Sequence, residues 1–275
     1  MKARLNRLFA SDGRCLNVAI DHGLFGEPAF LSGIEDMSRT IATVVEAAPD
    51  ALQLSLGQAR VLQAIPGPRK PALVVRSDVA NVYAVERSRY YFSELASRVV
   101  ESALALDAAC VVANILLLPN QAELYQSCLR NVSLLRGECE PVGMPLMVEP
   151  LVMRPGSEGY AVDGNVDKIV TLVRQAAELG ADIIKADPTD NLDDYHLVIQ
   201  AAGERPVLPR GGGRVPDREL LRRTETLMKQ GASGIVYGRN VIQHPDPMAM
   251  TRALMSLIHD DASTEHALSI LTSES

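Results

Sequence analysis

The sequence predicts an α/β fold, a single-domain (β/α)8 TIM barrel, on three observations. Eight short β-prone runs alternate with amphipathic helical patterns, and each run is apolar on both faces, as in a parallel sheet covered by helices. The length of 275 residues is typical of one such barrel. A doubly wound open sheet, the alternative, normally carries a glycine-rich fingerprint after its first strand, whereas this chain reads AIDHGLFGEP there, without GxGxxG.

The eight predicted strands are short runs rich in Val, Ile or Leu. In chain order they are 15–20, 51–56, 72–77, 110–117, 145–151, 181–186, 206–210 and 233–238.

The helical period is clearest in the second half of the chain. The helix expected at 163–179 has apolar residues at positions i, i+3, i+4, i+7 and i+11, which line one face. Gly180 follows it and can end the helix in the left-handed conformation. A further helix is expected at 216–230, with Pro216 in its first turn and Gly231 after its end. The last repeat has an apolar face of its own, formed by Met250, Leu254, Leu257 and Ile258.

Composition limits the classes of protein and partner. We expect the barrel to span residues 1–260 and residues 261–275 to form a polar, serine-rich tail whose final residues are loosely ordered. The net charge of −7 speaks against nucleic-acid binding, and no apolar run approaches the ~20 residues that span a bilayer. The first residues lack the apolar core of a secretory signal, so we expect a cytoplasmic protein without a membrane partner. The four cysteines show no ligand spacing, so no metal or other cofactor is expected.

Chemistry in such barrels gathers at the carboxyl ends of the strands, and Lys185 closes the sixth of them. A lysine pointing into a barrel is costly unless it is paired or neutral. Burial lowers its pKa, and a neutral amine can attack a carbonyl to form a Schiff base. The alternative is a structural ion pair with Asp21, Glu149 or Asp187.

The loops after the last two strands predict a phosphate site. Three glycines allow backbone N–H groups to approach an anion, and a Gly-Arg-Asn segment adds a guanidinium. Barrels often bind phosphate between these two loops, although a glycine run alone could be only a tight turn. The residues concerned are Gly211, Gly212, Gly213, Gly238 and Arg239.

Four segments resemble one known family. AIDHG, ADIIKADPT, PRGGGR and above all GASGIVYGRNVIQHPDPMAM are similar to the DeoC/LacD-type class I aldolases, in the branch of the archaeal fructose-bisphosphate aldolases. That branch also holds the 2-amino-3,7-dideoxy-heptulosonate synthase and the autoinducer-2 thiolase. The resemblance covers the barrel and is strongest from about 180 to 255. It implies that Lys185 forms the Schiff base, that Asp21 polarises the substrate or exchanges protons with it, and that the loop glycines and Arg239 bind phosphate.

One departure from the family concerns the fifth strand. The sugar-bisphosphate aldolases of the branch carry a tyrosine just after that strand as proton donor and acceptor, and its nearest match here is Leu151. Glu149 shares that face and resembles the fifth-strand glutamate of tagatose-bisphosphate aldolase instead. A carboxylate near the imine nitrogen can move protons, or it can merely pair with Lys185, and both interpretations stay open. The missing tyrosine argues against fructose 1,6-bisphosphate as the substrate.

Several other polar residues are secondary candidates. His22 is expected to point towards the helix layer and to be structural, if strand alternation continues beyond Asp21. Arg76 and Asp78 could contact a substrate or form an ion pair at the barrel mouth. His244 is expected to orient the last helix. Three tyrosines lie in or near the third loop, and nothing in the sequence selects one of them: Tyr83, Tyr90 and Tyr91.

The sequence therefore predicts a class I, metal-independent aldolase, a carbon–carbon lyase that uses no cofactor. Lys185 would form an iminium with a phosphorylated ketose, such as dihydroxyacetone phosphate, and Asp21 and Glu149 would shuttle protons. One alternative is a biosynthetic enzyme of the same family that condenses a phosphoketose with a semialdehyde or transfers an acyl group to coenzyme A. A second is a non-catalytic barrel that binds phosphosugars. We also expect a homo-oligomer, as is common for such barrels.

Overall fold

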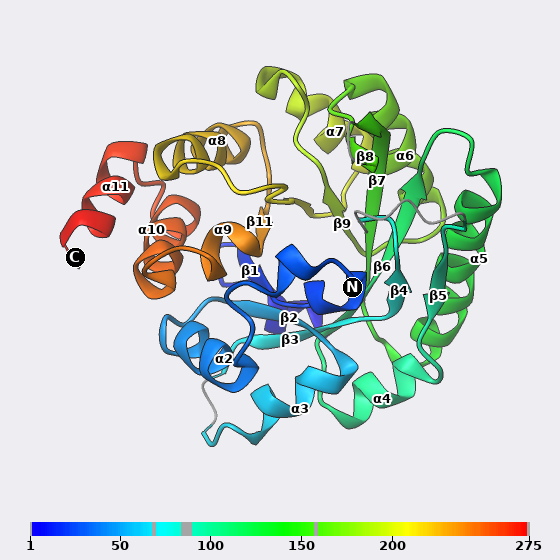
Figure 1. Cartoon of the computed structure of the whole chain (residues 1–275), viewed down its shortest axis with the longest axis horizontal. Helices are drawn as coiled ribbons and strands as arrows, with labels where there is room; N and C mark the ends of the chain where they lie inside the picture. The colour runs from blue at the N-terminus through cyan, green and yellow to red at the C-terminus, as the bar shows by residue number, and fades with distance from the viewer. Residues whose placement is uncertain (1, 68–69, 84–89, 157–158, 274–275) are drawn as a thin grey trace.

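The structure is a computed structural model that describes residues 2–67, 70–83, 90–156 and 159–273. Within these residues eight parallel strands form one sheet that curls into a barrel, in the order β10-β9-β7-β6-β3-β2-β1-β11. A bridge between Arg210 and Val236 joins the two ends of the sheet. The (β/α)8 barrel predicted from the sequence is confirmed. Figure 1 shows helices surrounding the ring of strands.

The barrel strands agree with the predicted runs, with one extension. Seven of them begin and end within two residues of the predicted bounds, and β7 continues five residues further, to Gly156. The eight strands are β1 Cys15–Ala19, β2 Ala51–Ser55, β3 Ala72–Arg76, β6 Cys110–Leu117, β7 Leu146–Gly156, β9 Ile183–Ala186, β10 Val207–Pro209 and β11 Gly234–Tyr237.

Two short antiparallel pairings rise above the barrel and were not expected. β4 Asp78–Ala80 pairs with β5 Ser93–Leu95, and the extended end of β7 pairs with β8 Gly159–Val162. Both involve the carboxyl ends of barrel strands, so they build up the rim on the side where active sites of this fold lie.

The helices pack their apolar faces on the outside of the strands. They are α1 Leu5–Leu8, α2 Met37–Glu46, α3 Leu56–Ala64, α4 Val99–Ala105, α5 Ala122–Cys139, α6 Val166–Glu178, α7 Tyr195–Ala202, α8 Asp217–Lys229, α9 Arg239–Ile242, α10 Pro247–His259 and α11 Thr264–Ser273. In the described part of the chain four single turns of 3-10 helix complete the set, at η1 His22–Phe25, η2 Pro28–Leu31, η3 Glu140–Val142 and η4 Leu192–Asp194. Among the described residues, no helix combines the length and the apolar character needed to cross a lipid bilayer.

Capping residues hold the ends of α6 and the start of α10. Asn165 caps α6 by accepting a hydrogen bond from the backbone N–H of Lys168, and Gly180 follows with a φ of +90°. Asp246 caps α10 in the same way. His244 accepts a hydrogen bond from the backbone N–H of Asp246 at 3.0 Å, which confirms its expected role in orienting the last helix.

The C-terminal segment differs from the expected polar tail. Residues Thr264–Ser273 form α11, which packs against α8 and α10 with Ala267 fully buried. The few apolar residues of the segment suffice for one amphipathic face. Glu225 of α8 holds the start of this helix by accepting a hydrogen bond from the backbone N–H of Thr264 at 3.0 Å. Residues 274–275 lie outside the described residues, so the expected looseness of the final residues remains a prediction.

The barrel interior is apolar at one end and charged at the other. Small and branched side chains fill the lower layers, among them Cys15, Val74, Val112 and Ile183, and Leu8 of α1 packs against them. Towards the carboxyl ends of the strands the buried residues become polar or charged: Gln53, Arg76, Glu149 and Lys185. This change marks the functional end of the barrel.

Candidate active site

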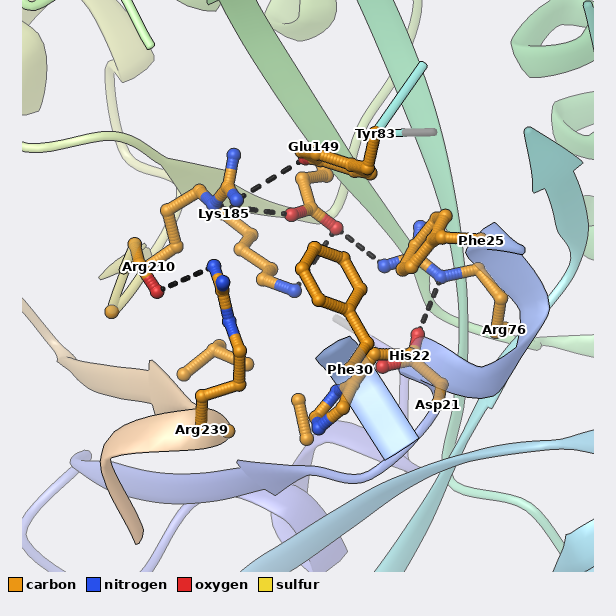
Figure 2. Close-up of a pocket in the computed structure, with 15 residues that line it drawn as sticks. Asp21, His22, Phe25, Phe30, Arg76, Tyr83, Glu149, Lys185, Arg210 and Arg239 are labelled. Carbon is orange, nitrogen blue, oxygen red and sulfur yellow. Dashed lines mark hydrogen bonds and ion pairs between the residues drawn. The ribbon is translucent and has the colours of Figure 1, made fainter. Parts of the chain in front are cut away.

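A cavity at the carboxyl end of the barrel collects most of the predicted site residues (Figure 2). It is lined by Asp21, Glu149, Lys185, Gly211, Gly212, Gly238 and Arg239 and by three of the secondary candidates, His22, Arg76 and Tyr83. The remaining lining residues were not singled out from the sequence: Ala19, Phe25, Phe30, Arg210 and Val236. Gly213 is not among the lining residues. Its carbonyl accepts a hydrogen bond from the side chain of Asn240 at 3.1 Å.

Lys185 enters the cavity from β9, with only 6% of its side chain exposed. Its Nζ lies 2.9 Å from Oε2 of Glu149, which comes from the neighbouring strand β7. Burial lowers the pKa of Lys185, and the Glu149 carboxylate opposes that shift. The geometry thus combines both possibilities drawn from the sequence, a desolvated amine and an ion pair.

Glu149 is surrounded by cations. Besides Lys185, it accepts a hydrogen bond from Arg76 Nη2 at 2.5 Å, and Arg210 Nε lies 3.5 Å from its other oxygen. Burial alone would raise the pKa of Glu149, but Lys185, Arg76 and Arg210 hold it well below its usual range. The carboxylate is therefore ionised at neutral pH.

Asp21 lies at the end of β1 beside the same arginine. Its Oδ2 accepts hydrogen bonds from Arg76 Nε at 2.7 Å and from the Gln53 amide at 2.8 Å. Burial opposes ionisation, but Arg76 and Lys185 outweigh it and keep the pKa of Asp21 below its usual value. Arg76 thus links the Asp21 and Glu149 carboxylates, and this fixes both on the same side of the lysine.

Arg76 and Asp78 form the ion pair at the barrel mouth that was one of the two expectations for them. The Arg76 Nη1–Asp78 Oδ1 distance is 3.3 Å. The other oxygen of Asp78 accepts hydrogen bonds from Asn114, both from its backbone N–H and from its side chain. Asp78 does not line the cavity, so its role is to hold Arg76 in place.

The phosphate loops are held by side chains that bind their carbonyl oxygens. Arg223, Arg239 and Asn240 donate to the backbone carbonyls of Gly211 and Gly212, at 2.8 to 3.2 Å. Gly212 has a φ of +63°, which favours glycine. These bonds fix the conformation of the loop that lines the cavity.

Arg239 carries an uncompensated positive charge into the cavity. Within the described residues it makes no ion pair with a carboxylate, whereas Arg76 and Arg210 each make at least two. Its guanidinium lies over the Phe30 ring, 4.5 Å from the ring centre. Burial, with the charge of Arg210, lowers the pKa of Arg239. An anionic ligand at this point would offset both effects.

His22 corrects one expectation. It lines the cavity instead of facing the helix layer, because β1 ends at Ala19 and His22 begins the 3-10 turn η1, so strand alternation no longer applies. Its buried Nε2 has no hydrogen-bond partner in the described structure. Burial lowers the pKa of His22 to about 4, so the ring is neutral at pH 7.

Two residues of the cavity were missed or left undecided by the sequence. Arg210, just after β10, lies 3.4 Å from Asp187 and donates a hydrogen bond to the hydroxyl of Tyr83 at 3.2 Å. The structure thereby selects Tyr83 among the tyrosines near loop 3. Arg210 is the last residue of the predicted strand 206–210, and a charge at the end of an apolar strand is the signal that could have identified it. Leu151, the nearest match to the family tyrosine, lies instead in an apolar cluster with Leu116 and Leu124.

Comparison with known proteins shows the family of this chain. The family model described as DeoC/LacD family aldolase matches residues 15–244. The chain belongs to the DeoC/LacD aldolase family. The resemblance stated from the sequence motifs is thus confirmed.

Relatives of this DeoC/LacD-family chain include enzymes with different reactions. It is 34% identical over 274 residues to an uncharacterised aldolase of Saccharolobus solfataricus, covering 98% of this chain and 97% of that one. It is 31% identical over 277 residues to the 3-hydroxy-5-phosphonooxypentane-2,4-dione thiolase of Salmonella typhimurium, covering 100% and 87%. Among solved structures, an archaeal fructose 1,6-bisphosphate aldolase superposes with a TM-score of 0.77 at 23% identity, covering 94% and 99%.

Proposed function

We propose that this protein is a class I aldolase in which Lys185 forms a Schiff base with a phosphorylated ketone or ketose. The observation that carries the proposal is the buried amine of Lys185, 2.9 Å from Glu149, in a cavity that also receives the unpaired guanidinium of Arg239. A desolvated amine supplies the nucleophile, and the guanidinium supplies a partner for phosphate. The family to which the chain belongs supports the same chemistry.

The reaction begins with the amine. The Lys185 ammonium passes a proton to Glu149, and the neutral amine attacks the ketone carbon. The same proton leaves with the ketone oxygen as water, which gives an iminium that draws electrons from the adjacent carbon. The positive charge stays on the nitrogen, so Glu149 stabilises the iminium as it stabilises the resting ammonium. Asp21, across Arg76, takes and returns the proton on the adjacent carbon, and Glu149 accepts protons at the nitrogen.

The phosphate is held by the two loops at the other side of the cavity. Gly211, Gly212 and Gly238 provide close backbone approach, and Arg239 provides the charge. Binding there places the ketone next to Lys185, so binding energy from the phosphate serves to orient the reacting carbon. Dihydroxyacetone phosphate fits this description, since its phosphate and its ketone are separated by one carbon.

A second candidate is a condensing or transferring reaction on the same imine. It is supported by the thiolase relative, and by the 2-amino-3,7-dideoxy-D-threo-hept-6-ulosonate synthase of Halobacterium salinarum, 28% identical over 266 residues. The position of Leu151 away from the cavity also favours it over cleavage of fructose 1,6-bisphosphate. The cytoplasmic location and the homo-oligomer expected from the sequence remain predictions.

The test is turnover with matched lysine variants. Dihydroxyacetone phosphate is supplied with a panel of aldehydes, and separately with coenzyme A and phosphorylated diketones, to distinguish the two candidates. Lys185→Met is expected to abolish turnover, and Lys229→Met, a surface change on α8, to leave it unchanged. Full turnover by Lys185→Met would contradict the proposal.

A further inference from the structure

The ring of Tyr83 is fixed over the cavity by aromatic contacts. Its centre lies 5.1 Å from that of Phe25 and 5.6 Å from that of Phe30, both edge-on or tilted. Phe25 belongs to η1 and Phe30 to η2, so two turns that follow β1 hold a side chain that follows β4. Figure 2 shows the ring of Tyr83 beside Glu149, on the side of the cavity where Lys185 enters.

The hydrogen bond of Tyr83 determines where its proton can go. Arg210 Nη2 donates to the phenolic oxygen at 3.2 Å. A guanidinium has no acceptor, so the phenolic hydrogen must point away from Arg210. Among the described residues no acceptor is found for this hydrogen, and Tyr83 lines the cavity. The hydrogen is therefore free to meet a ligand oxygen.

Carbon–carbon bond formation on an enamine needs such a proton. When the enamine carbon attacks an aldehyde, the aldehyde oxygen becomes an alkoxide, which requires an acid beside it. At the enamine stage Asp21 holds the proton that it took from the adjacent carbon, and Arg76 and Gln53 fix its carboxyl group. Glu149 is ionised at neutral pH and so carries no proton to give, and the nitrogen of Lys185 is part of the enamine. His22 is neutral and is a far weaker acid than a phenol. Besides Asp21, the described group lining the cavity that can act as an acid is the Tyr83 hydroxyl.

We propose that Tyr83 is a catalytic residue that donates its phenolic proton to the oxygen of the incoming aldehyde, and takes it back from that hydroxyl in cleavage. The inference rests on the proposed aldolase function. In the condensation the enamine π pair forms the new carbon–carbon bond, and the carbonyl π pair moves to the aldehyde oxygen. That oxygen takes the proton of Tyr83. Hydrolysis of the iminium by water then frees the ketone and the ammonium of Lys185. The proton that Asp21 took from the carbon passes through water to Tyr83, so every group regains its resting state.

Arg210 supports both states of the phenol. Its guanidinium is anchored by Glu149 at 3.5 Å and Asp187 at 3.4 Å, which keeps it in place beside the hydroxyl. Burial raises the pKa of Tyr83 and Arg210 opposes that shift, so the phenol is protonated at rest. Once the proton has left, the same guanidinium faces the phenolate and stabilises it. An alkoxide is a much stronger base than a phenolate, so the transfer runs downhill.

The experiment compares Tyr83→Phe with the wild-type protein in three measurements. Dihydroxyacetone phosphate is the probe for imine trapping by borohydride and for exchange of its carbon-bound hydrogen with deuterated water. Turnover is measured with D-glyceraldehyde 3-phosphate, D-erythrose 4-phosphate and glycolaldehyde as aldehydes. Because Phe keeps the ring against Phe25 and Phe30, the fold is expected to be retained. Tyr160→Phe is the matched control, since its hydroxyl donates to the Pro119 carbonyl outside the cavity.

Tyr83→Phe is expected to trap the imine and to exchange deuterium at wild-type rates, while kcat for carbon–carbon bond formation falls about 100-fold or more. Turnover within about threefold of wild type would overturn the assignment. So would the joint loss of trapping, exchange and turnover, which would mean that Tyr83 serves imine formation. A wild-type protein that forms no imine, or that forms it and joins none of the aldehydes, would overturn the aldolase proposal itself and this assignment with it.

Discussion

Lys185 and Glu149 form a buried ion pair across two adjacent strands, with 2.9 Å between Nζ and Oε2. Two arginines share the same carboxylate, Arg76 at 2.5 Å and Arg210 at 3.5 Å. The lysine thus lies among competing influences: burial and the two guanidinium groups favour its neutral form, and the carboxylates of Glu149 and Asp21 favour the charged one. The reactivity of the amine depends on this balance.

Removing the charge of Glu149 shifts the pH dependence of imine formation downwards. Burial lowers the pKa of Lys185 and Glu149 opposes that shift, so Glu149→Gln lowers this pKa further. The neutral fraction of the amine rises as pH rises through the pKa, so the midpoint of the trapping rate should move to lower pH. Initial rates of borohydride trapping between pH 6 and 10 measure this.

The matched control for that experiment is Glu101→Gln, which removes a surface carboxylate paired with Arg98. It should leave the midpoint unchanged. A midpoint that moves upwards in Glu149→Gln would show that the pair does not set the pKa of Lys185. The plateau of the trapping rate at high pH tests whether Glu149 also transfers protons, because the plateau of Glu149→Gln falls only in that case.

Arg239 should account for most of the preference for phosphorylated substrates. Replacing its unpaired guanidinium in Arg239→Met is expected to raise KM for dihydroxyacetone phosphate 10- to 100-fold, roughly the 1.4 to 3 kcal/mol of a charge-assisted contact. KM for unphosphorylated dihydroxyacetone should change little. Arg222→Met, an exposed change on α8, is the control. Equal effects of Arg239→Met on both ketones would contradict a phosphate role.

Two neighbouring glycines provide a comparison within one loop. A Cβ at Gly211 would lie 2.9 Å from the Tyr237 ring, whereas a Cβ at Gly213 would meet nothing within 4 Å. Gly211→Ala should therefore displace the loop, destabilise the fold by about 1–3 kcal/mol and raise KM for the phosphorylated ketone. Gly213→Ala should leave the stability of the fold and this KM near their wild-type values. Thermal unfolding and steady-state kinetics measure the two quantities. A larger effect of Gly213→Ala than of Gly211→Ala would contradict the described conformation of this loop.

Elements set by neighbouring residues could be predicted from the sequence, whereas contacts between residues distant along the chain could not. The barrel strands were predictable because their apolar runs are continuous and bounded by turns, and Lys185 was identifiable because a charge closes an apolar run. The hairpin of β4 and β5 was not, since its strands are three residues each and are separated by twelve positions. Arg210 and Tyr83 lie 127 positions apart, and only folding brings their side chains together. The prediction for His22 was wrong because it assumed that the alternation of side chains along the strand continues beyond Asp21, whereas β1 ends at Ala19.

At the opposite end of the barrel, His259 should make the free energy of unfolding decrease as pH rises into the alkaline range. It bonds Asp50 at 2.9 Å and Asp12 at 2.7 Å. The hydrogen bond to Asp50, aided by that to Asp12 and opposed by burial, raises the pKa of His259 to about 9. A histidine of the unfolded chain titrates near 6.5. The stabilisation is therefore complete below about pH 6.5 and is lost as pH rises through about 9.

Urea unfolding between pH 6 and 10 measures the effect. The free energy of unfolding of the wild-type protein should fall by about 2 kcal/mol over this range, and His259→Gln should remove most of that slope. His266→Gln, at an exposed position of α11, serves as the control. An unchanged slope in His259→Gln would mean that other groups cause the alkaline loss.

The most direct test of the central claim is to locate the trapped imine in the sequence. The protein is incubated with dihydroxyacetone phosphate, reduced with borohydride and digested, and the modified peptide is identified by mass spectrometry. One adduct is expected, on Lys185, and it should disappear in Lys185→Met. An adduct on another lysine, or none with any phosphorylated ketone tried, would contradict it.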